Sequence, residues 1–391
     1  MSTQPASAAP PFPYRELAHV VIAQLVYGIC WSTFLLLPKF MTLELGAGPS
    51  EIGLVSAIPG STAALAVPFV GRLIDRAGRR PLIVAGAALA AFTAFGFTAV
   101  ERIGPLLYFL QLTYGLSFVL TFNAAGTLAA DIAPPERMSQ VLGVFGASNV
   151  VTNAIAPAIG EPLASAVGWQ PVFASAGVVG IVAVFLSLRI RERPSTGISE
   201  PPLPGGSSDW VVRRYALAMC AQGAAFSVAF AFYQPFALSL GMHEVRDFFI
   251  GFALSVLLAR VGLGSVPDGF GRKRVAVIAL GLYALAEIGM SRLTPGTLAL
   301  YGALLGLGHG FFYPAVNAMA VERTRRSERG KVMTFLNGGF QVGYTIGVLS
   351  FGALAERTGY PTVFVLGGCV VAAAAAMLAS TPRNAPRAAP A

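Results

Sequence analysis

The chain has 391 residues, of which 55% are hydrophobic and only 12% are charged, and its mean hydropathy is +0.68. This number of charged residues is too small to cover the surface of a water-soluble protein of this length. The composition therefore excludes a soluble protein and predicts an integral membrane protein. The formal net charge of +9 does not indicate a nucleic-acid partner, because the positive residues are sorted among loops in the way that membrane topology requires.

The N-terminal segment is polar and rich in proline up to Pro13. It lacks the cationic start and short apolar core of a signal peptide. We expect residues 1–16 to form a disordered cytoplasmic tail.

Twelve apolar runs follow, each of about the 20 residues that are needed to cross a bilayer. The first six are expected at residues 17–38, 50–70, 81–99, 105–130, 139–161 and 171–189. The second six are expected at residues 213–238, 246–266, 275–292, 296–321, 331–355 and 361–379. Pro, Gly and Ser dominate residues 191–212, which predicts a cytoplasmic linker between an N-terminal bundle (17–190) and a C-terminal bundle (213–380), with a tail at 381–391.

Lysine and arginine test the topology of these spans. Alternate loops divide them into a set of 21 on one face and a set of five on the other, with Arg260 inside a span. Because positive residues are enriched in cytoplasmic loops, both termini and the linker are expected in the cytoplasm, and the protein in the cell inner (plasma) membrane as a multi-pass protein.

A charged, glycine-marked loop occurs once in each half. Residues 71–80 read GRLIDRAGRR, and residues 264–273 read GSVPDGFGRK at the same spacing of Gly, Asp, Gly and a basic pair. Leu107-Tyr108 and Leu300-Tyr301 continue the correspondence at the same offset. The sequence therefore predicts an all-α membrane protein with twelve transmembrane helices, arranged as two parallel six-helix repeats.

The motif G-x-x-x-D-R-x-G-R-R at 71–80 is a well-known mark of the major facilitator superfamily, which the chain resembles along essentially its whole length. Within that family it looks closest to bacterial drug/proton-antiporter-type efflux permeases, whose fifth span often carries a Gly/Pro-rich motif, here residues 155–161. Ala156 and Glu161 stand where glycines are expected, and Gln111 replaces an arginine that many antiporters carry before Gly115. The resemblance implies the major facilitator fold and a monomer that needs no cofactor.

The resemblance favours secondary-active transport of a small organic solute by alternating access, as proton-coupled efflux. Two alternatives stay open: a solute/proton symporter or facilitator that mediates uptake, and a membrane sensor that binds without transporting. An enzyme is not expected, since the chain has no nucleotide-binding loop, HExxH-type metal site or nucleophile with a plausible base. The three cysteines lie in apolar runs without CxxC spacing, so neither a metal site nor a disulfide is expected.

The resemblance also implies a gating role for the two repeated loops, which would latch the cytoplasmic side in the outward-facing state. Arg137 is a candidate partner of Asp75; the alternative is that these arginines only set the topology. The expected gating residues are Gly71, Asp75, Arg76, Gly78, Arg79, Arg137, Gly264, Asp268, Gly271 and Arg272.

Polar side chains at membrane depth are costly and usually face a cavity or the bundle interior. In this family's architecture the first, fourth, seventh and tenth spans line the path, and the second, fifth, eighth and eleventh contribute. The expected substrate-binding residues on these spans are Gln24, Tyr27, Trp31, Asn149, Asn153, Gln222, Tyr233, His309, Tyr313, Asn317, Asn337 and Gln341, with Gln234 at similar depth.

Three residues are candidates for proton coupling: His309, Asp131 and Glu161. His309 is the only histidine well within a span, and its free pKa lies near physiological pH, although a hydrogen-bonded packing role is the alternative. Glu287 in the ninth span is expected to bond to a neighbouring helix. Arg260 is expected to reach a partner or the cytoplasmic surface by extending along the span.

Overall fold

A computed structural model describes residues 14–133, 137–191, 210–324 and 329–381, without the side chains of 67, 68, 71, 72, 75, 139 and 330. The described residues form helices and short connections, with no strand among them. Most of the expected tails (1–13 and 382–391) and of the expected linker (192–209) lies outside the described residues. The expected bounds are wrong at two places, because residues 14–16 belong to α1 and residues 210–212 belong to α8. The fold is therefore all-helical, as the composition predicts.

The helices form two consecutive sets. The first comprises α1 (Tyr14–Ser32), η1 (Thr33–Leu36), α2 (Leu37–Glu44), α3 (Pro49–Ala77), α4 (Arg79–Phe97), α5 (Pro105–Ile132), α6 (Met138–Val167) and α7 (Trp169–Leu188). The second comprises α8 (Trp210–Ser239), α9 (Arg246–Leu257), the π-helical turn η3 (Leu258–Gly262), α10 (Val266–Phe270), α11 (Arg272–Met290), α12 (Leu298–Glu322), α13 (Arg329–Thr358) and α14 (Tyr360–Ser380).

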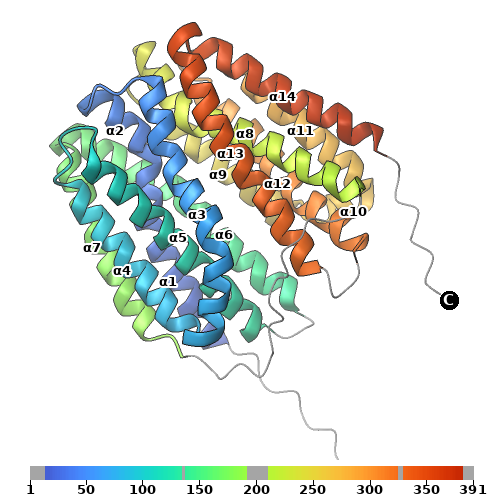
Figure 1. Cartoon of the computed structure of the whole chain (residues 1–391), viewed down its shortest axis with the longest axis horizontal. Helices are drawn as coiled ribbons and strands as arrows, with labels where there is room; N and C mark the ends of the chain where they lie inside the picture. Colours follow the sequence, from blue (N-terminus) through green and yellow to red (C-terminus); the bar gives the residue numbers. More distant parts are fainter. Residues whose placement is uncertain (1–13, 134–136, 192–209, 325–328, 382–391) are drawn as a thin grey trace, which may run out of the picture.

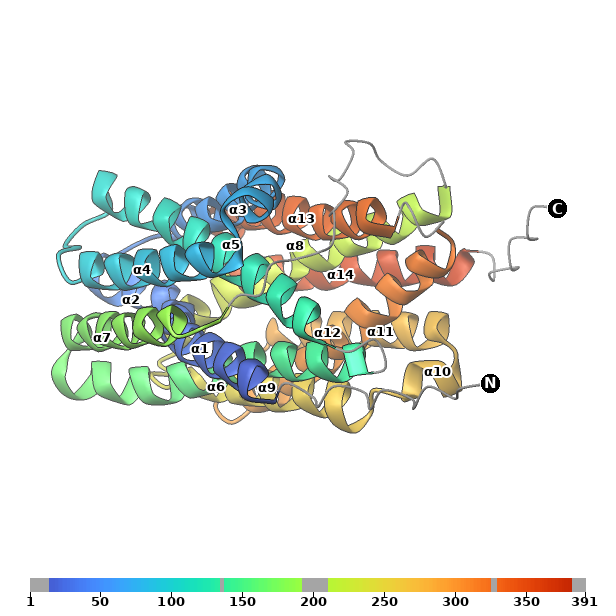
Figure 2. The same cartoon turned by 90° about the horizontal axis from the view of Figure 1, so that it is seen from below.

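The two sets pack as two bundles side by side, with α1–α7 in one and α8–α14 in the other (Figure 1). The most extensive contacts between the bundles are those of α3 with α13 and of α6 with α9, and α8 also contacts α2 and α3. Figure 2 shows the two main pairs on opposite sides of the molecule.

Glycines in the left-handed region of backbone space mark equivalent corners of the two bundles. Gly78 (φ 87°) separates α3 from α4, and Gly271 (φ 91°) precedes α11. Gly168 (φ 86°) and Gly359 (φ 80°) likewise precede α7 and α14. A residue with a Cβ rarely adopts this conformation, so each corner requires glycine. The four corners explain why these glycines recur at a nearly constant offset.

Eight helical segments of the described residues are long and apolar enough to cross a membrane. They are the continuous segment Tyr14–Glu44, then Arg79–Phe97, Pro105–Ile132, Gln140–Val167, Trp169–Leu188, Trp210–Ser239, Leu298–Glu322 and Tyr360–Ser380. The other expected spans overlap α3, α9 with η3, α11 and α13. Two of the twelve expected spans are interrupted: the first by the 3-10 turn η1 and the eighth by the π turn η3.

Small residues set the helix contacts inside each bundle. A Cβ on Gly180 of α7 would lie 2.8 Å from the Cα of Ala91 on α4, and one on Gly308 of α12 would lie 2.7 Å from the carbonyl oxygen of Ala279 on α11. Helices without a hydrophobic driving force between them associate through such close backbone contacts. The high glycine content is thus part of the packing.

Candidate functional site

A buried carboxylate joins the two bundles at one end of the molecule. Glu161 on α6, whose side chain is 1% exposed, forms an ion pair with Lys39 on α2. In the other bundle, the backbone N–H groups of Val245 and Arg246 at the start of α9 donate hydrogen bonds to the same carboxylate, at 2.8 and 2.9 Å. Lys39 also donates to the carbonyl oxygen of His243. We call these five residues the Glu161 clamp.

The clamp satisfies the carboxylate fully. An ionised glutamate has about four lone-pair sites, and Glu161 receives one side-chain donor and two backbone donors, one of which contacts both of its oxygens. The start of α9 also supplies the positive end of a helix dipole. A buried ion pair is stable only when the remaining hydrogen-bonding sites are satisfied, and the clamp meets that condition by drawing donors from both bundles.

Helices α3 and α13, one from each bundle, cross in close contact near the same end of the molecule. A Cβ on Gly53 would lie 2.5 Å from the carbonyl oxygen of Val348, and one on Gly352 would lie 2.9 Å from that of Pro49. Either side chain would therefore force the two helices apart. Beside this crossing, the backbone N–H of Ser50 donates to the carboxylate of Glu356 at 3.2 Å.

One further bond crosses between the bundles: the amide of Gln234 donates to the carbonyl of Leu35 at 2.7 Å. Among the described residues, this bond, the clamp and the Ser50–Glu356 bond are the hydrogen bonds and ion pairs that join the bundles. We call the end that holds Glu161 and Glu356 the clamp end, and the end that holds Gly78 and Gly271 the loop end. The bundles are thus fastened together at the clamp end.

The polar residues expected on the first and fifth spans meet inside the first bundle. Gln24 donates to Asn149 at 2.7 Å. Ser32 donates to Asn153 at 2.9 Å and lies 3.0 Å from the hydroxyl of Thr152. These bonds hold α1 against α6, and Asn149 and Asn153 stay half-buried.

Aromatic residues lie beside that polar cluster. The ring of Trp31 stacks on Tyr114 with a centroid distance of 5.1 Å and lies 5.0 Å from Phe118. Tyr27 is buried and bonds with Ser117 of α5 at 3.1 Å. Tyr27 therefore fastens α1 to α5, whereas half-buried Trp31 retains an indole nitrogen without a hydrogen-bond partner among the described residues.

In the second bundle the amide of Gln222 lies 2.9 Å from Nδ1 of His309. Three phenylalanines surround the imidazole, with centroid distances of 5.3 Å to Phe226, 5.7 Å to Phe252 and 6.5 Å to Phe340. Among the described residues, His309 therefore has one hydrogen-bonding neighbour, the neutral amide of Gln222, within a mainly aromatic setting that also includes Tyr313 at a centroid distance of 6.2 Å.

The remaining expected binding residues divide into two places. Tyr313 on α12 donates to Asn337 on α13, and Asn317 and Gln341 are buried or half-buried on the same two helices. Tyr233 lies elsewhere: its hydroxyl donates to the carbonyl of Val245 at 3.1 Å, and its ring stacks on Phe248 at 4.1 Å. Tyr233 therefore supports the clamp loop and is not grouped with the other candidates.

The first repeated loop is fastened within its own bundle. Arg79, 8% exposed, pairs with Asp131 at the end of α5, at 3.1 Å. Arg137 donates to the hydroxyl of Tyr14 at 3.0 Å. The surroundings of Gly71 and the side chain of Asp75 are not described by the structure, and Arg76 is exposed. Asp131, expected as a proton-coupling group, thus has an arginine partner that links the start of α4 to the end of α5.

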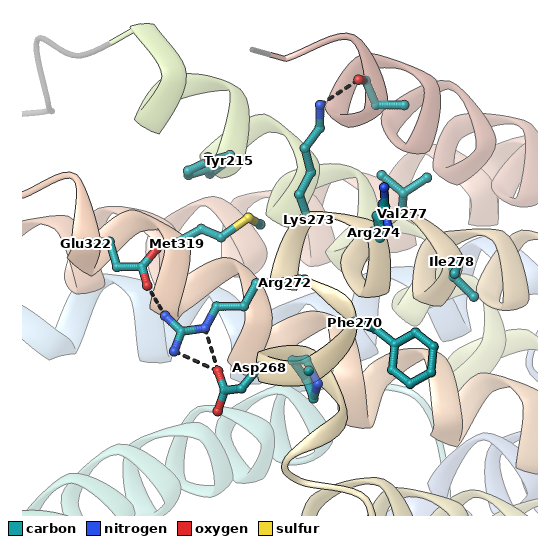
Figure 3. Close-up of a pocket in the computed structure, with 14 residues that line it drawn as sticks. Tyr215, Asp268, Phe270, Arg272, Lys273, Arg274, Val277, Ile278, Met319 and Glu322 are labelled. Carbon is teal, nitrogen blue, oxygen red and sulfur yellow. Dashed lines mark hydrogen bonds and ion pairs between the residues drawn. The ribbon is translucent and has the colours of Figure 1, made fainter. Parts of the chain in front are cut away.

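The second loop repeats this arrangement. Arg272 at the start of α11 binds Asp268 at 2.7 and 2.9 Å and also pairs with Glu322 at the end of α12 (Figure 3). Lys273 donates to the carbonyl of Ala379 at 2.7 Å. A cavity of about 1000 Å³ lies beside these residues and is lined in part by Tyr215, Phe270 and Met319. It opens beside the loop and contains none of the expected substrate-binding residues.

One expectation about buried polar residues is wrong. The sequence predicts that Glu287 on α11 bonds to a neighbouring helix, yet it is fully buried and neither carboxylate oxygen has a hydrogen-bond partner among the described residues. The helix register directs this side chain inward, and the sequence alone does not fix that register. The sequence also predicts that Arg260 in η3 reaches a partner or the surface; Arg260 is half-buried and its Nε has no partner among the described residues, so this expectation stays a prediction.

The sequence does not predict the Glu161 clamp or the burial of Lys39 within it. Lys39 follows Pro38 at the end of an apolar run, which places it among the five basic residues of the outer loops. The structure instead places it 4% exposed in α2. The available signal was its apolar surroundings, Leu-Leu-Leu-Pro before it and Phe-Met after it, which are unusual for a solvated lysine.

Comparison with known proteins settles the family. A profile described as Major Facilitator Superfamily matches residues 20–268 and again residues 215–391. The chain belongs to the major facilitator superfamily. This superfamily consists of membrane transporters, not enzymes. The resemblance to this superfamily is therefore confirmed, and the protein is a membrane transporter of small molecules.

Relatives within the superfamily agree with this assignment. The chain is 26% identical over 349 residues to "Multi-drug resistance efflux pump PmrA" of Streptococcus pneumoniae, covering 84% of this chain and 86% of that protein. It is 26% identical over 381 residues to "Multidrug resistance protein MdtG" of Escherichia fergusonii, covering 90% and 91%. The crystal structure of the nucleoside transporter NupG superposes with a TM-score of 0.76 at 15% identity, covering 93% and 98%, which supports the fold alone.

Proposed function

We propose that the protein is a proton-coupled efflux transporter of small organic solutes that works by alternating access. In this proposal residues 17–190 and 213–380 are two six-helix bundles with twelve membrane crossings in total. The loop end faces the cytoplasm, together with both termini and the linker, and the protein works as a monomer in the inner membrane. The excess of arginine and lysine in the loops at this end supports that orientation.

The Glu161 clamp is the observation that carries the proposal. An alternating-access transporter must close one end of its path while the other end is open. The bonds between bundles among the described residues lie toward the clamp end, so the conformation corresponds to an inward-facing state. The clamp then acts as the outer gate, because it must break before the outer end can open.

The substrate path runs, in this proposal, between the polar cluster of the first bundle and the His309 cluster of the second. Both clusters combine amide groups with aromatic rings. A site of this kind binds amphipathic small molecules, since the rings supply apolar contact and the amides fix orientation. The relative named as a multi-drug resistance efflux pump supports the direction of transport, and the second relative is named as a multidrug resistance protein.

The three proton-coupling candidates take different roles in the proposal. His309 is the proton carrier, because it is a histidine within a path-lining helix and its ring nitrogen hydrogen-bonds to the amide of Gln222. Glu161 is the outer gate. Asp131 is a structural partner of Arg79, since the equivalent pair in the second bundle, Glu322 with Arg272, joins the corresponding helices.

The test is solute uptake by purified protein in proteoliposomes with an imposed pH gradient. The solutes form a panel of aromatic monoanions, neutral aromatics and aromatic monocations. An antiporter accumulates its solute in liposomes with an acidic lumen, and a protonophore abolishes the accumulation. Accumulation that instead requires an acidic exterior indicates a symporter, and equilibration that ignores the gradient indicates a facilitator; either result rejects the proposal.

A further inference from the structure

Arg260 lies in the π-helical turn that ends α9. The turn η3 spans five residues, and π turns are rare elements that occur often at functional sites. Leu258 and Val261 on this turn are 53% and 71% exposed, as expected of apolar side chains that face lipid, whereas Ala259 is buried. Arg260 itself is half-buried.

The guanidinium of Arg260 points across to the other bundle. One of its terminal nitrogens, Nη1, lies 3.8 Å from the position that a Cβ on Gly146 of α6 would occupy. Because Gly146 has no side chain, it leaves room beside the guanidinium. Arg260 therefore lies at the boundary between the bundles.

No counter-charge accompanies this cation within the part of the chain that the structure describes. Among those residues Arg260 has neither a hydrogen bond nor an ion pair, and its Nε is buried. Other basic residues of the described chain, including Lys39, Arg79 and Arg272, meet a carboxylate directly. Ionisable residues within membrane spans are rare, and those that persist usually line a substrate or ion path.

Gly146, Tyr313 and Asn337 lie at a similar distance from the loop end, measured along their helices. Gly146 and Asn337 are each eight residues into helices that begin at the loop end, which is about 12 Å along the axis at the rise of an α-helix. Tyr313 lies nine residues before the loop end of α12 and donates to Asn337. The ring of Tyr313 in turn stacks on that of His309 at a centroid distance of 6.2 Å.

Aromatic rings of the first bundle lie close to Gly146 along the chain. Phe145 directly precedes Gly146 on α6, is buried, and has its ring 5.7 Å from that of Phe122 on α5. Phe122 in turn stacks on Phe118 at 5.1 Å. A cation without a counter-charge among the described residues thus lies at the boundary between the bundles, with two polar groups in its own bundle and a row of aromatic rings in the other.

We propose that Arg260 binds the anionic group of the transported solute, and that the solutes are amphipathic organic monoanions, an aromatic body carrying one carboxylate. This inference rests on the proposed transport function and names its substrate class. A guanidinium presents two parallel N–H donors that match a carboxylate. Tyr313 and Asn337 offer further polar contacts, and the aromatic rows hold the apolar body.

A single positive charge also sets the charge of the solute. Binding a monocarboxylate neutralises Arg260, so the loaded path carries no net charge from this pair. An aromatic cation meets repulsion at Arg260, and a dianion keeps one charge without a partner at membrane depth. The position near the loop end further implies that the anion enters from the cytoplasmic side in the inward-facing state.

The inference is tested with three matched probes: naphthalene-2-carboxylate, naphthalene-2-carboxamide and naphthalen-2-ylmethylammonium. Binding to the purified full chain in lipid nanodiscs is measured by titration calorimetry at neutral pH. We expect the carboxylate to bind at least about tenfold more tightly than the carboxamide, as a charge-assisted bidentate pair requires, and the ammonium to bind weakest.

Two variants and one control locate the effect. In Arg260→Gln the ratio of carboxylate affinity to carboxamide affinity should fall to near one. In Arg260→Lys the ratio should be intermediate, because the positive charge remains while the two parallel N–H donors of the guanidinium are lost. Arg292→Gln, at an exposed position in the α11–α12 connection, keeps the full preference. Thermal unfolding of each variant confirms that the fold persists, and Arg260→Lys supplies the answer if Arg260→Gln does not fold.

Two results would overturn the inference. One is a wild-type protein that binds the carboxamide or the ammonium as tightly as the carboxylate; the other is a carboxylate preference that survives in both Arg260 variants. Transport failure is distinguishable from these outcomes. If carboxylate binding depends on Arg260 but no gradient-driven flux is found, the proposed transport cycle is rejected and the anion site is kept. If gradient-driven flux is found for neutral or cationic solutes alone, the anion site is rejected.

Discussion

Glu161→Gln should shift the protein from the inward-facing to the outward-facing state. The substitution keeps the size of the side chain and removes its charge, so Lys39 remains buried beside a neutral amide. Two backbone donors at the start of α9 also lose an anionic acceptor. The outward-facing state is not affected in the same way, because opening the clamp end gives Lys39 access to water.

The size of the shift follows from the burial of the pair. Removing one partner of a buried ion pair costs about 3–5 kcal/mol, and both side chains here are at most 5% exposed. Each 1.4 kcal/mol is about a factor of ten in an equilibrium constant. We therefore expect the inward-facing population to fall by roughly two to three and a half orders of magnitude relative to the outward-facing population.

The shift is measurable with spin labels and double electron–electron resonance. In a background in which the three cysteines are replaced, one label pair is placed at Arg102 and Arg292, in exposed connections at the clamp end of the two bundles. A second pair is placed at Ala77 and Phe270, exposed at the loop end. In Glu161→Gln the clamp-end distance should lengthen and the loop-end distance should shorten.

Two controls separate the clamp from a general loss of charge. Glu244 lies in the same loop as His243, but its side chain is 65% exposed and pairs with Arg246, so Glu244→Gln should leave both distances unchanged. The double variant Lys39→Met/Glu161→Gln should recover part of the inward-facing population, because it removes the unpaired buried cation. Distances in Glu161→Gln that match the wild type at both ends would refute the role of the clamp.

Three further predictions test other parts of the account. His309→Gln should abolish gradient-driven accumulation while permitting downhill exchange, because exchange needs no group that changes its charge; accumulation at the wild-type level in flux assays would exclude His309 as the carrier. Gly53→Val should disfavour closure of the clamp end in the spin-label assay, since its side chain meets the Val348 carbonyl, whereas Gly143→Val, which meets nothing within 4 Å, should not. Arg272→Gln should lower the free energy of unfolding by no more than about 1 kcal/mol, because its ion pairs are exposed; a larger loss in thermal unfolding would mean that the second repeated loop has more than a fastening role.

The helices and their connections could be predicted largely from the sequence. Apolar runs of bilayer length, interrupted by glycines and charged loops, have few alternatives to membrane helices. The corner at Gly78 and its equivalent at Gly271 are visible as a repeat without knowledge of their backbone angles. The interruption of the eighth span by a π turn is not visible, because nothing in the residues around Arg260 distinguishes it from an ordinary helix.

The sequence predicts the depth of the site residues along their membrane spans, but it does not predict which residues form hydrogen bonds or ion pairs with one another. The sequence places Gln24, Asn149, Gln222 and His309 at mid-depth on path-lining spans, and the structure joins them as two pairs. The partner of Glu161 could not be predicted in this way. Lys39 lies 122 positions away along the chain, and the two meet only because the bundles close at the clamp end.

The ion-pair partners of the charged residues at the loop end could not be predicted from the sequence either. The family resemblance implies a latch on the cytoplasmic side at the first repeated loop, with Arg137 as a candidate partner of Asp75. Arg79 and Arg272 form equivalent ion pairs inside their own bundles, which the sequence does not predict. The side chain of Asp75 lies outside the described residues, so its latch role stays a prediction for the outward-facing state.

The most direct test of proton-coupled efflux is proton movement that depends on solute. Proteoliposomes are loaded with a pH-sensitive dye and an acidic lumen, and the solute found in the uptake panel is then added outside. An antiporter predicts that addition of solute raises the lumenal pH at a rate that follows solute uptake, with Glu161→Gln and His309→Gln both impaired. Solute uptake that proceeds with no change in lumenal pH would contradict the account.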